Sequence, residues 1–230
     1  MTKTLDLYTV IYNDEDFLPY FLEYYSFVDR MTFIDSNSTD RTIQILKDFA
    51  TADHPNVRLI QSGATWWDWN LLHPYRNHIW KDSEMDIILF PDCDEIFYHP
   101  SGLRWYLENT DYDVYEMQGF EMVAPRLPDG SILKVNKGVP FQVYNKFTIF
   151  KNGIDIKFPS AHTYCSPSPS VCKGEIKLLH YRNLGIELMK KRRDREKARL
   201  SKNFKYRAAH TDKEIKERFE KLTKEAVKVI

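Results

Sequence analysis

Residues 86–98 read DIILFPDCDEIFY. The apolar run from Ile87 to Phe90 stops at Pro91, and the carboxylic acids Asp92, Asp94 and Glu95 follow almost at once. A short continuous apolar run bounded by a proline is typical of a strand that is buried on both faces. The sequence therefore predicts a buried strand that opens directly into an acidic loop.

The segments before this strand alternate between strand and helix patterns. Short apolar runs predict strands at residues 5–12, 31–34 and 57–60, and apolar spacing of three and four predicts helices at 17–25, 43–49 and 71–80. This alternation favours a mainly parallel sheet with helices on both faces, in which ligands lie beyond the carboxyl ends of the strands. Three of these ends are polar: Asn13–Asp16, Asp35–Asp40 and Asp92–Glu95. Right-handed crossovers would bring them to one edge of the sheet.

The pattern changes after residue 95. We expect a short helix at 101–109 and two antiparallel strands at 114–120 and 141–151, separated by a turn at Asp129-Gly130. Residues 153–172 contain three prolines and read as a loop, and a last strand follows at 176–181. From residue 184 the chain is charged and helical in character.

The overall composition says little about binding partners, but the distribution of charge along the chain says more. The 230 residues carry no formal net charge, but residues 187–207 hold ten Lys and Arg against three acids. This basic arm reads either as a solvated helix face or as a surface for anionic lipid headgroups, which would place the protein peripherally at a membrane. We expect no nucleic-acid partner because no recognised binding motif is present, and no segment approaches the ~20 apolar residues of a membrane span.

The three cysteines, Cys93, Cys165 and Cys172, lack the spacing of a zinc site. Cys165 and Cys172 flank a Ser/Pro loop and are able to pair. The odd number of cysteines and the missing signal peptide favour a reducing compartment, so we expect a cytoplasmic protein.

The Asp-X-Asp pair suggests a metal site. Asp92 and Asp94 are one residue apart, so both carboxylates are able to reach one ion directly or through water. Oxygen ligands of this kind suit Mg²⁺ or Mn²⁺, which keep waters and accept substrate phosphates. The alternative is a capped turn with solvated acids. The preceding apolar strand and the two other polar strand ends favour the metal.

Together these stretches resemble the family 2 glycosyltransferases, which have the GT-A fold. The resemblance covers about the first 120 residues and is carried by residues 9–18, residues 28–42, Arg76-Asn77, and Asp92-Cys93-Asp94-Glu95. It implies an α/β fold with a Rossmann-like, mostly parallel sheet flanked by helices, a small antiparallel part and C-terminal helices. It also implies a catalytic domain at 1–183, with a nucleotide-sugar half (1–100) and an acceptor half (101–183), followed by a charged extension at 184–230.

The resemblance assigns roles to particular residues. The nucleotide-sugar would be held by residues on the first strand, the second loop and the acidic motif: Tyr8, Val10, Tyr12, Asn13, Asp35, Asn37, Arg76, Asp92 and Cys93. Asp35 suits this role because a carboxylate accepts hydrogen bonds from uracil or a ribose hydroxyl, although it also suits a turn cap. Asp94 would contact the cation directly, and Asp92 would lie nearer the ribose or a metal-bound water.

Later residues would complete the site. His180 ends the predicted last strand and is our candidate for a third metal ligand, with a satisfied core histidine as the rival interpretation. Arg182 would neutralise phosphate, and His162 and Trp67 would contact phosphate or the acceptor.

The resemblance implies hexosyl or pentosyl transfer with inversion. The donor would be a UDP-linked sugar, and the acceptor a glycan, glycoprotein or glycolipid. Inversion needs a carboxylate base, for which we prefer Glu121 over Glu116 and Asp155. The rival classes are a haloacid-dehalogenase-like phosphatase, which also places Asp-X-Asp after an apolar strand, and a non-catalytic carbohydrate-binding or assembly protein.

Overall fold

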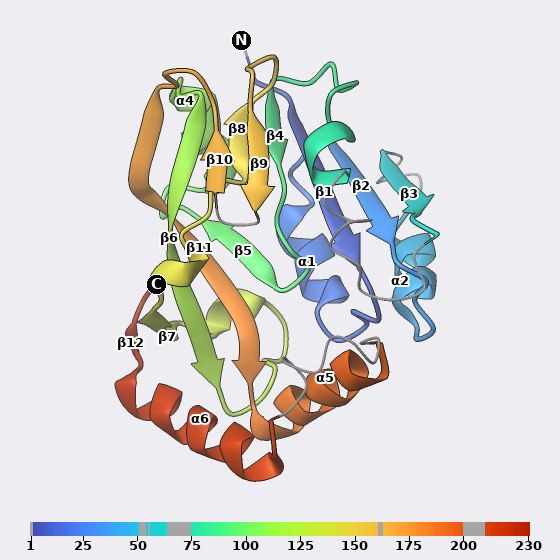
Figure 1. Cartoon of the computed structure of the whole chain (residues 1–230), viewed down its shortest axis with the longest axis vertical. Helices are drawn as coiled ribbons and strands as arrows, with labels where there is room; N and C mark the ends of the chain where they lie inside the picture. Colours follow the sequence, from blue (N-terminus) through green and yellow to red (C-terminus); the bar gives the residue numbers. More distant parts are fainter. Residues whose placement is uncertain (1, 51–53, 55, 64–74, 161–162, 200–209) are drawn as a thin grey trace.

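The computed structural model describes residues 2–50, 54, 56–63, 75–160, 163–199 and 210–230. Its first half is a parallel sheet in the order β3 (Val57–Gln61), β2 (Arg30–Asp35), β1 (Leu5–Ile11), β4 (Ile87–Leu89). The helices α1 (Leu18–Tyr25) and α2 (Thr42–Phe49) connect the first three strands. Figure 1 shows β1, β2 and β4 running in the same direction, as predicted.

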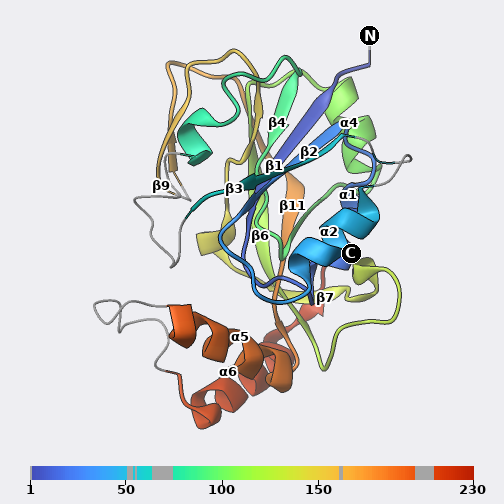
Figure 2. The same cartoon turned by 90° about the vertical axis from the view of Figure 1, so that its right-hand side faces the viewer.

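Both faces of this sheet are covered. Figure 2 shows α1 and α2 on one side and the helical turn at residues 75–78 on the other. Alternate residues of a strand point to opposite faces, and Leu7 accordingly packs in the cluster under α1 while Tyr8 packs in the cluster with Trp80 and Phe90. This two-sided burial explains why β4 is apolar throughout and why β1 is apolar apart from the buried Asp6 and Thr9.

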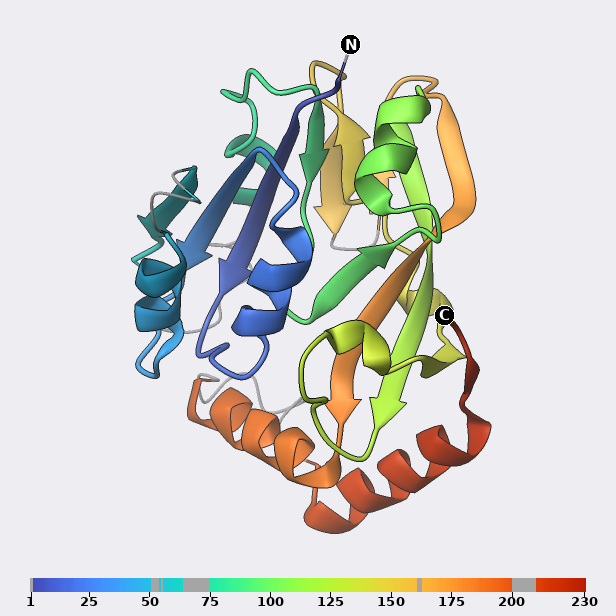
Figure 3. The same ribbon diagram turned by 180° about the vertical axis from the view of Figure 1, so that it is seen from behind.

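The second half of the sheet is mixed. β8 (Ile149–Lys151) pairs antiparallel with β4, and β6 (Val114–Ala124) pairs antiparallel with β8 and with β7 (Lys137–Pro140). The long strand β11 (Val171–Leu184) runs parallel to β6 and antiparallel to β5 (Glu95–Tyr98). Figure 3 shows β5 beside β11, with α4 (Leu103–Asn109) above them. The acidic loop therefore lies between two buried strands, β4 and β5.

The prediction of one strand at 141–151 was wrong. The chain instead forms the 3₁₀ turn η2 (Gln142–Tyr144) before β8, and β7 ends at Pro140. The N–H groups of Tyr144 and Asn145 donate to the carbonyl oxygens of Phe141 and Gln142, at 2.9 Å each. These local bonds replace ladder bonds, so apolar composition alone misled the prediction here.

The prediction of a loop at 153–172 was also wrong. This region contains β9 (Lys157–Ser160) and β10 (Thr163–Cys165), which pair as a small antiparallel sheet of their own. Pro159 is tolerated because each strand of a two-stranded sheet has one unpaired edge. β11 is likewise longer at both ends than the predicted strand at 176–181.

The C-terminal segment is helical, as expected, and returns to the sheet. α5 (Ile186–Arg199) and α6 (Asp212–Glu225) lie beyond the end of the sheet at which β1, β2, β6 and β11 terminate (Figures 1 and 3). A capping box between Thr211 and Glu214 begins α6, and β12 (Val227–Lys228) then pairs with β7. The division of the chain into a domain and an extension stays a prediction.

The structure bears on two expectations for the chain, one about membrane-spanning helices and one about the cysteines. Across the described ranges, no helix combines the length and apolar character needed to traverse a bilayer. All three cysteines are free thiols, with Cys93 and Cys172 buried and Cys165 exposed.

Candidate functional site

The predicted polar ends of β1, β2 and β4 share one edge of the sheet. Asn13 and Asn37 both adopt positive φ, at 52° and 61°, a conformation that asparagine tolerates better than most residues. The Asn13 side-chain oxygen accepts from the Thr39 backbone N–H at 2.6 Å, and the buried Asp35 carboxylate accepts from the Ser38 N–H at 3.1 Å. Asn13 therefore fixes the first loop to the second, and Asp35 caps the loop that it begins.

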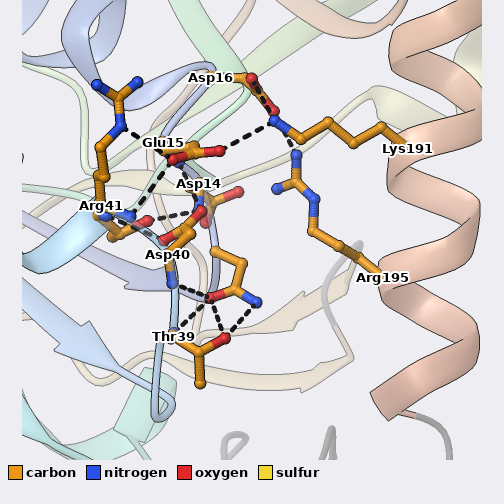
Figure 4. Close-up of polar contacts among 10 residues, drawn as sticks. Asp14, Glu15, Asp16, Thr39, Asp40, Arg41, Lys191 and Arg195 are labelled. Carbon is orange, nitrogen blue, oxygen red and sulfur yellow. Dashed lines mark hydrogen bonds and ion pairs between the residues drawn. The ribbon is translucent and has the colours of Figure 1, made fainter.

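The loop after β1, which contains Asp14, Glu15 and Asp16, docks against α5 through ion pairs. Figure 4 shows Lys191 and Arg195 reaching from α5 to Glu15 and Asp16. The Lys191 ammonium lies 3.0 Å from Glu15 and 2.8 Å from Asp16, and the Arg195 guanidinium also contacts Asp16. Part of the basic arm thus binds acids of its own chain, and the lipid contact stays a prediction.

The two aspartates of the Asp-X-Asp motif have different partners. Asp92 accepts from the Lys146 ammonium at 2.7 Å and from the Arg76 guanidinium at 3.2 Å. Lys146 is itself buried and also donates to the fully buried Glu95 at 2.5 Å. Burial opposes ionisation of Asp92, but Lys146 and Arg76 prevail and hold its pKa below the usual range. Asp92 is therefore neutralised by side chains of the protein itself.

Asp94 instead faces groups that arrive from distant parts of the chain. Its Oδ2 atom lies 2.8 Å from Arg192 of α5 and 3.4 Å from His180 Nε2 of β11. Burial would raise the pKa of Asp94, but the cationic Arg192 and His180 lower it well below its ordinary value. Neither contact has hydrogen-bond geometry, so the buried Oδ2 atom remains without a hydrogen-bond partner.

His180 is held from its other side by Glu121. The two residues are paired in the β6–β11 register, and His180 Nδ1 lies 3.1 Å from Glu121 Oε1. The Tyr144 ring packs on the imidazole, with centroids 4.1 Å apart. Burial would lower the pKa of His180, but Asp94 and Glu121 raise it overall. Only when His180 is neutral does a hydrogen bond from Nδ1–H to Glu121 leave the Nε2 lone pair available to a cation beside Asp94.

The Asp94–His180 pair fits a divalent cation. In protein metal sites a ligating histidine usually bonds a carboxylate through its other nitrogen, as His180 does with Glu121. Asp94 Oδ2, which pairs with Arg192 at 2.8 Å, supplies a carboxylate oxygen beside the imidazole. Among the described residues, no group of three or more His, Cys, Asp or Glu side chains is arranged to hold a metal. A cation here would rely on two protein ligands, and Mg²⁺ and Mn²⁺ complete such sites with water and substrate oxygens.

The remaining predicted site residues have no contact with Asp94 or His180 among those described above. Tyr8 turns its hydroxyl to Asp6 at 2.7 Å, and Cys93 packs its thiol in the core, so neither side chain points outward. Arg182 pairs with Glu196 of α5. Val10 and Tyr12 are half-buried at the end of β1. The predictions for His162 and Trp67 lie outside the described residues.

Two basic side chains of the site, Lys146 and Arg192, were not predicted as site residues. Lys146 fell inside a supposed strand, where its neighbours Asn145 and Phe147 gave no signal of a buried site lysine. Arg192 was counted in the basic arm, whose helical docking depends on contacts with residues more than 90 positions away in the chain. Neither partner is close in sequence, so spacing alone did not reveal them.

Comparison with known proteins identifies the fold. No model of a known protein family matches the sequence, and no curated protein matches it. Among solved structures, TarS of S. aureus is similar at 16% identity and a TM-score of 0.50, over 77% of this chain and 36% of that chain. TarS 1-349 matches at 15% identity and a TM-score of 0.49, over 94% of this chain and 69% of that chain. A Pyrobaculum calidifontis mannosyltransferase in complex with GDP-Man and Mn²⁺ matches at 17% identity and a TM-score of 0.35, over 59% and 39% of the two chains.

The likeness to TarS shows a GT-A-type fold, the class of fold found in glycosyltransferases. This confirms the predicted fold class. The chain spans little more than a third of the TarS chain, 36%, in that comparison.

Asp14, in the loop after β1, is expected to make the stability of the protein depend on pH. Burial raises its pKa to about 6. The native state therefore binds this proton more tightly than the unfolded chain, and stability falls as pH rises from the ordinary aspartate pKa toward 6. At neutral pH the ionised group costs up to about 3 kcal/mol of folding free energy.

We expect Asp14→Asn to raise the melting temperature at pH 7.5 and to flatten the decline between pH 4 and 7. The substitution keeps an oxygen to accept the Tyr12 N–H, which donates at 2.9 Å. Thermal unfolding across this range measures the effect. Asp129→Asn is the control, since that side chain is 95% exposed. An unchanged pH profile in Asp14→Asn would show that Asp14 is not responsible.

Proposed function

We propose that this protein is a metal-dependent, inverting glycosyltransferase of the family 2 type. Its donor is a nucleotide-sugar, which we take to be UDP-linked, and its acceptor is a glycan, glycoprotein or glycolipid. The observation that carries the proposal is the contact of His180 with Glu121 at 3.1 Å and with Asp94 at 3.4 Å, where Asp94 lies in the loop after β4 of a GT-A-type sheet. Ligands of open α/β sheets bind at this edge.

The cation and the basic side chains have complementary tasks. When bound by Asp94 and His180, Mn²⁺ or Mg²⁺ would act as a Lewis acid on the departing diphosphate. Arg192 approaches Asp94 from α5, and it would contact phosphate oxygens of a donor bound there. Lys146 and Arg76 neutralise Asp92, which reduces repulsion between the acidic motif and an anionic donor. Preorganised positive charge of this kind stabilises a leaving group as negative charge develops on it.

The fold supports transfer over the rival interpretations. A GT-A-type sheet with Asp92 and Asp94 after its fourth strand is the arrangement that the family resemblance implies. A phosphatase would not need a nucleotide for metal-dependent stabilisation. A purely carbohydrate-binding protein would not turn over a donor.

The proposal is tested by thermal unfolding with UDP, with and without Mn²⁺, followed by turnover of a panel of nucleotide-sugars. We expect UDP to raise the melting temperature only when Mn²⁺ is present, and at least one nucleotide-sugar to be hydrolysed or transferred. Stabilisation by inorganic phosphate and Mg²⁺ in place of UDP, with phosphate-ester hydrolysis, would instead identify a phosphatase.

Glu121 has two candidate roles that kinetics separates. The sequence suggests a catalytic base, whereas the geometry favours a positioning residue, because Glu121 is buried and bonds His180. We expect Glu121→Gln to raise the Mn²⁺ concentration for half-maximal activity by about 10–100-fold while kcat at saturating Mn²⁺ is largely retained.

The opposite result would restore the base assignment. A loss of kcat of about 10²–10⁴-fold with unchanged Mn²⁺ activation is the signature of a missing general base. Glu116→Gln and Asp155→Asn serve as comparison variants, since Glu116 is half-buried and Asp155 is exposed.

A further inference from the structure

Aromatic contacts lead from the Asp94–His180 pair through the turn η2 to Phe141, which precedes the turn. Tyr144 packs on His180 with ring centroids 4.1 Å apart, and Phe141 packs on Tyr144 with centroids 5.1 Å apart. The segment then continues to Lys146, which binds Asp92 and Glu95. One short stretch of chain therefore contacts both aspartate sites and extends away from them.

This stretch is fixed to β6 rather than free. The Phe141 N–H donates to the Gly119 carbonyl oxygen, and the Gly119 N–H donates to the Asn145 side chain, each at 2.9 Å. A Cβ atom at Gly119 would lie 2.5 Å from the backbone of Tyr144, so the close approach of turn and strand requires glycine there. The position of the turn relative to His180 is thus set by the backbone.

Two large apolar side chains of the same segment are exposed. Phe141 is 41% exposed and Val143 is 56% exposed. They are two of the five large apolar side chains that are exposed in the described part of the chain, and the other three, Leu59, Trp105 and Val227, lie on other elements. Between them Gln142 presents an exposed amide, which both donates and accepts hydrogen bonds.

We propose that Phe141, Gln142 and Val143 form a subsite for a pyranose ring of the acceptor. This inference rests on the proposed function and names the acceptor class that the site takes. The aromatic face is electronegative and the C–H face of a sugar ring is weakly positive and apolar, so the two stack with exclusion of water. Gln142 would bond ring hydroxyls at the edge of the stack. The rigid turn would hold the acceptor at a constant distance from Asp94 and His180.

The patch suits a sugar ring better than a lipid chain. It consists of one aromatic ring and one valine, separated by a polar residue, and so matches a small amphipathic ring. An acyl chain would need a continuous apolar surface. The third alternative, a second copy of the protein, would bury a far larger area than two side chains provide.

The test uses saturation-transfer NMR with a panel of methyl glycopyranosides in the presence of UDP and Mg²⁺. We expect ring C–H signals from at least one glycoside with the wild-type chain, and binding weakened about tenfold in Phe141→Ala. Trp105→Ala is the matched control, because Trp105 is another exposed aromatic residue, at 56%, on α4. Donor hydrolysis, measured as UDP release without acceptor, should stay within about twofold of wild type in Trp105→Ala, since Trp105 is an exposed residue of α4.

Several results would overturn the inference. These are glycoside binding that is unchanged in Phe141→Ala, an equal loss in Trp105→Ala, no glycoside binding to the wild-type chain, or binding of dodecyl but not methyl glycosides, which would indicate a lipid subsite. Phe141-dependent glycoside binding without any donor hydrolysis would support the subsite and reject the transferase. Failure of the inference and failure of the proposed function are therefore distinguishable.

Discussion

Sugar transfer is expected to disappear in the Asp94→Ala variant, together with the Mn²⁺-dependent stabilisation by UDP. Asp94 Oδ2 is the buried carboxylate oxygen that faces His180 Nε2 at 3.4 Å. Its removal leaves a cation with a single protein ligand and removes the charge that holds it at the diphosphate. Loss of one preorganised electrostatic contact typically costs about 10²–10³-fold in kcat, and loss of the metal itself costs more.

Turnover of the nucleotide-sugar identified with the wild-type chain measures this effect, and circular dichroism checks the fold. Asp129→Ala is the control, because Asp129 is an exposed aspartate on the β6–β7 connection. A folded Asp94→Ala protein with turnover within about fivefold of wild type would refute the metal assignment, because it would retain far more than such a loss allows.

The largest effect on stability is expected from Lys146→Met. Lys146 is buried and its ammonium lies 2.7 Å from Asp92 and 2.5 Å from the fully buried Glu95. Removing one partner of a buried ion pair leaves an uncompensated charge and typically costs about 3–5 kcal/mol. Urea denaturation, read as the change in midpoint at constant slope, measures the loss.

A second substitution identifies the cause. Because the cost arises from the unpaired Glu95, Lys146→Met combined with Glu95→Gln should recover part of the lost stability. Lys151→Met is the matched control, since its ion pair with Asp111 is largely exposed and such pairs contribute little to stability. Equal small losses in Lys146→Met and Lys151→Met would show that the buried network contributes little.

The parallel half of the fold was predictable because its signals are local. Continuous apolar runs at β1 and β4 reflect burial on both faces, and the helices between them carry their own periodicity. Topology rules then place the loops of Asn13, Asp35 and Asp94 at one edge without knowledge of any side-chain contact. The Asp94–His180 juxtaposition was anticipated in this way, with the family resemblance supplying the late histidine.

The remainder depends on contacts between distant segments. Nothing near Lys146 in sequence indicates that it lies between Asp92 and Glu95, more than 50 residues earlier. The turn at Gln142–Tyr144 exists because Gly119 allows the chain to cross β6 closely, and composition alone resembled a strand. Arg192 reaches Asp94 only because α5 docks on the loop after β1, and this docking has no signal in the local sequence.

Pulsed electron paramagnetic resonance of Mn²⁺ bound with UDP provides the most direct test of a cation shared by the protein and a diphosphate. We predict hyperfine coupling to ³¹P of the diphosphate and to one imidazole ¹⁴N, with the nitrogen coupling lost in His180→Gln. A ³¹P coupling without any histidine nitrogen in the wild-type protein, or an identical nitrogen coupling in His180→Gln, would contradict the site described for Asp94 and His180.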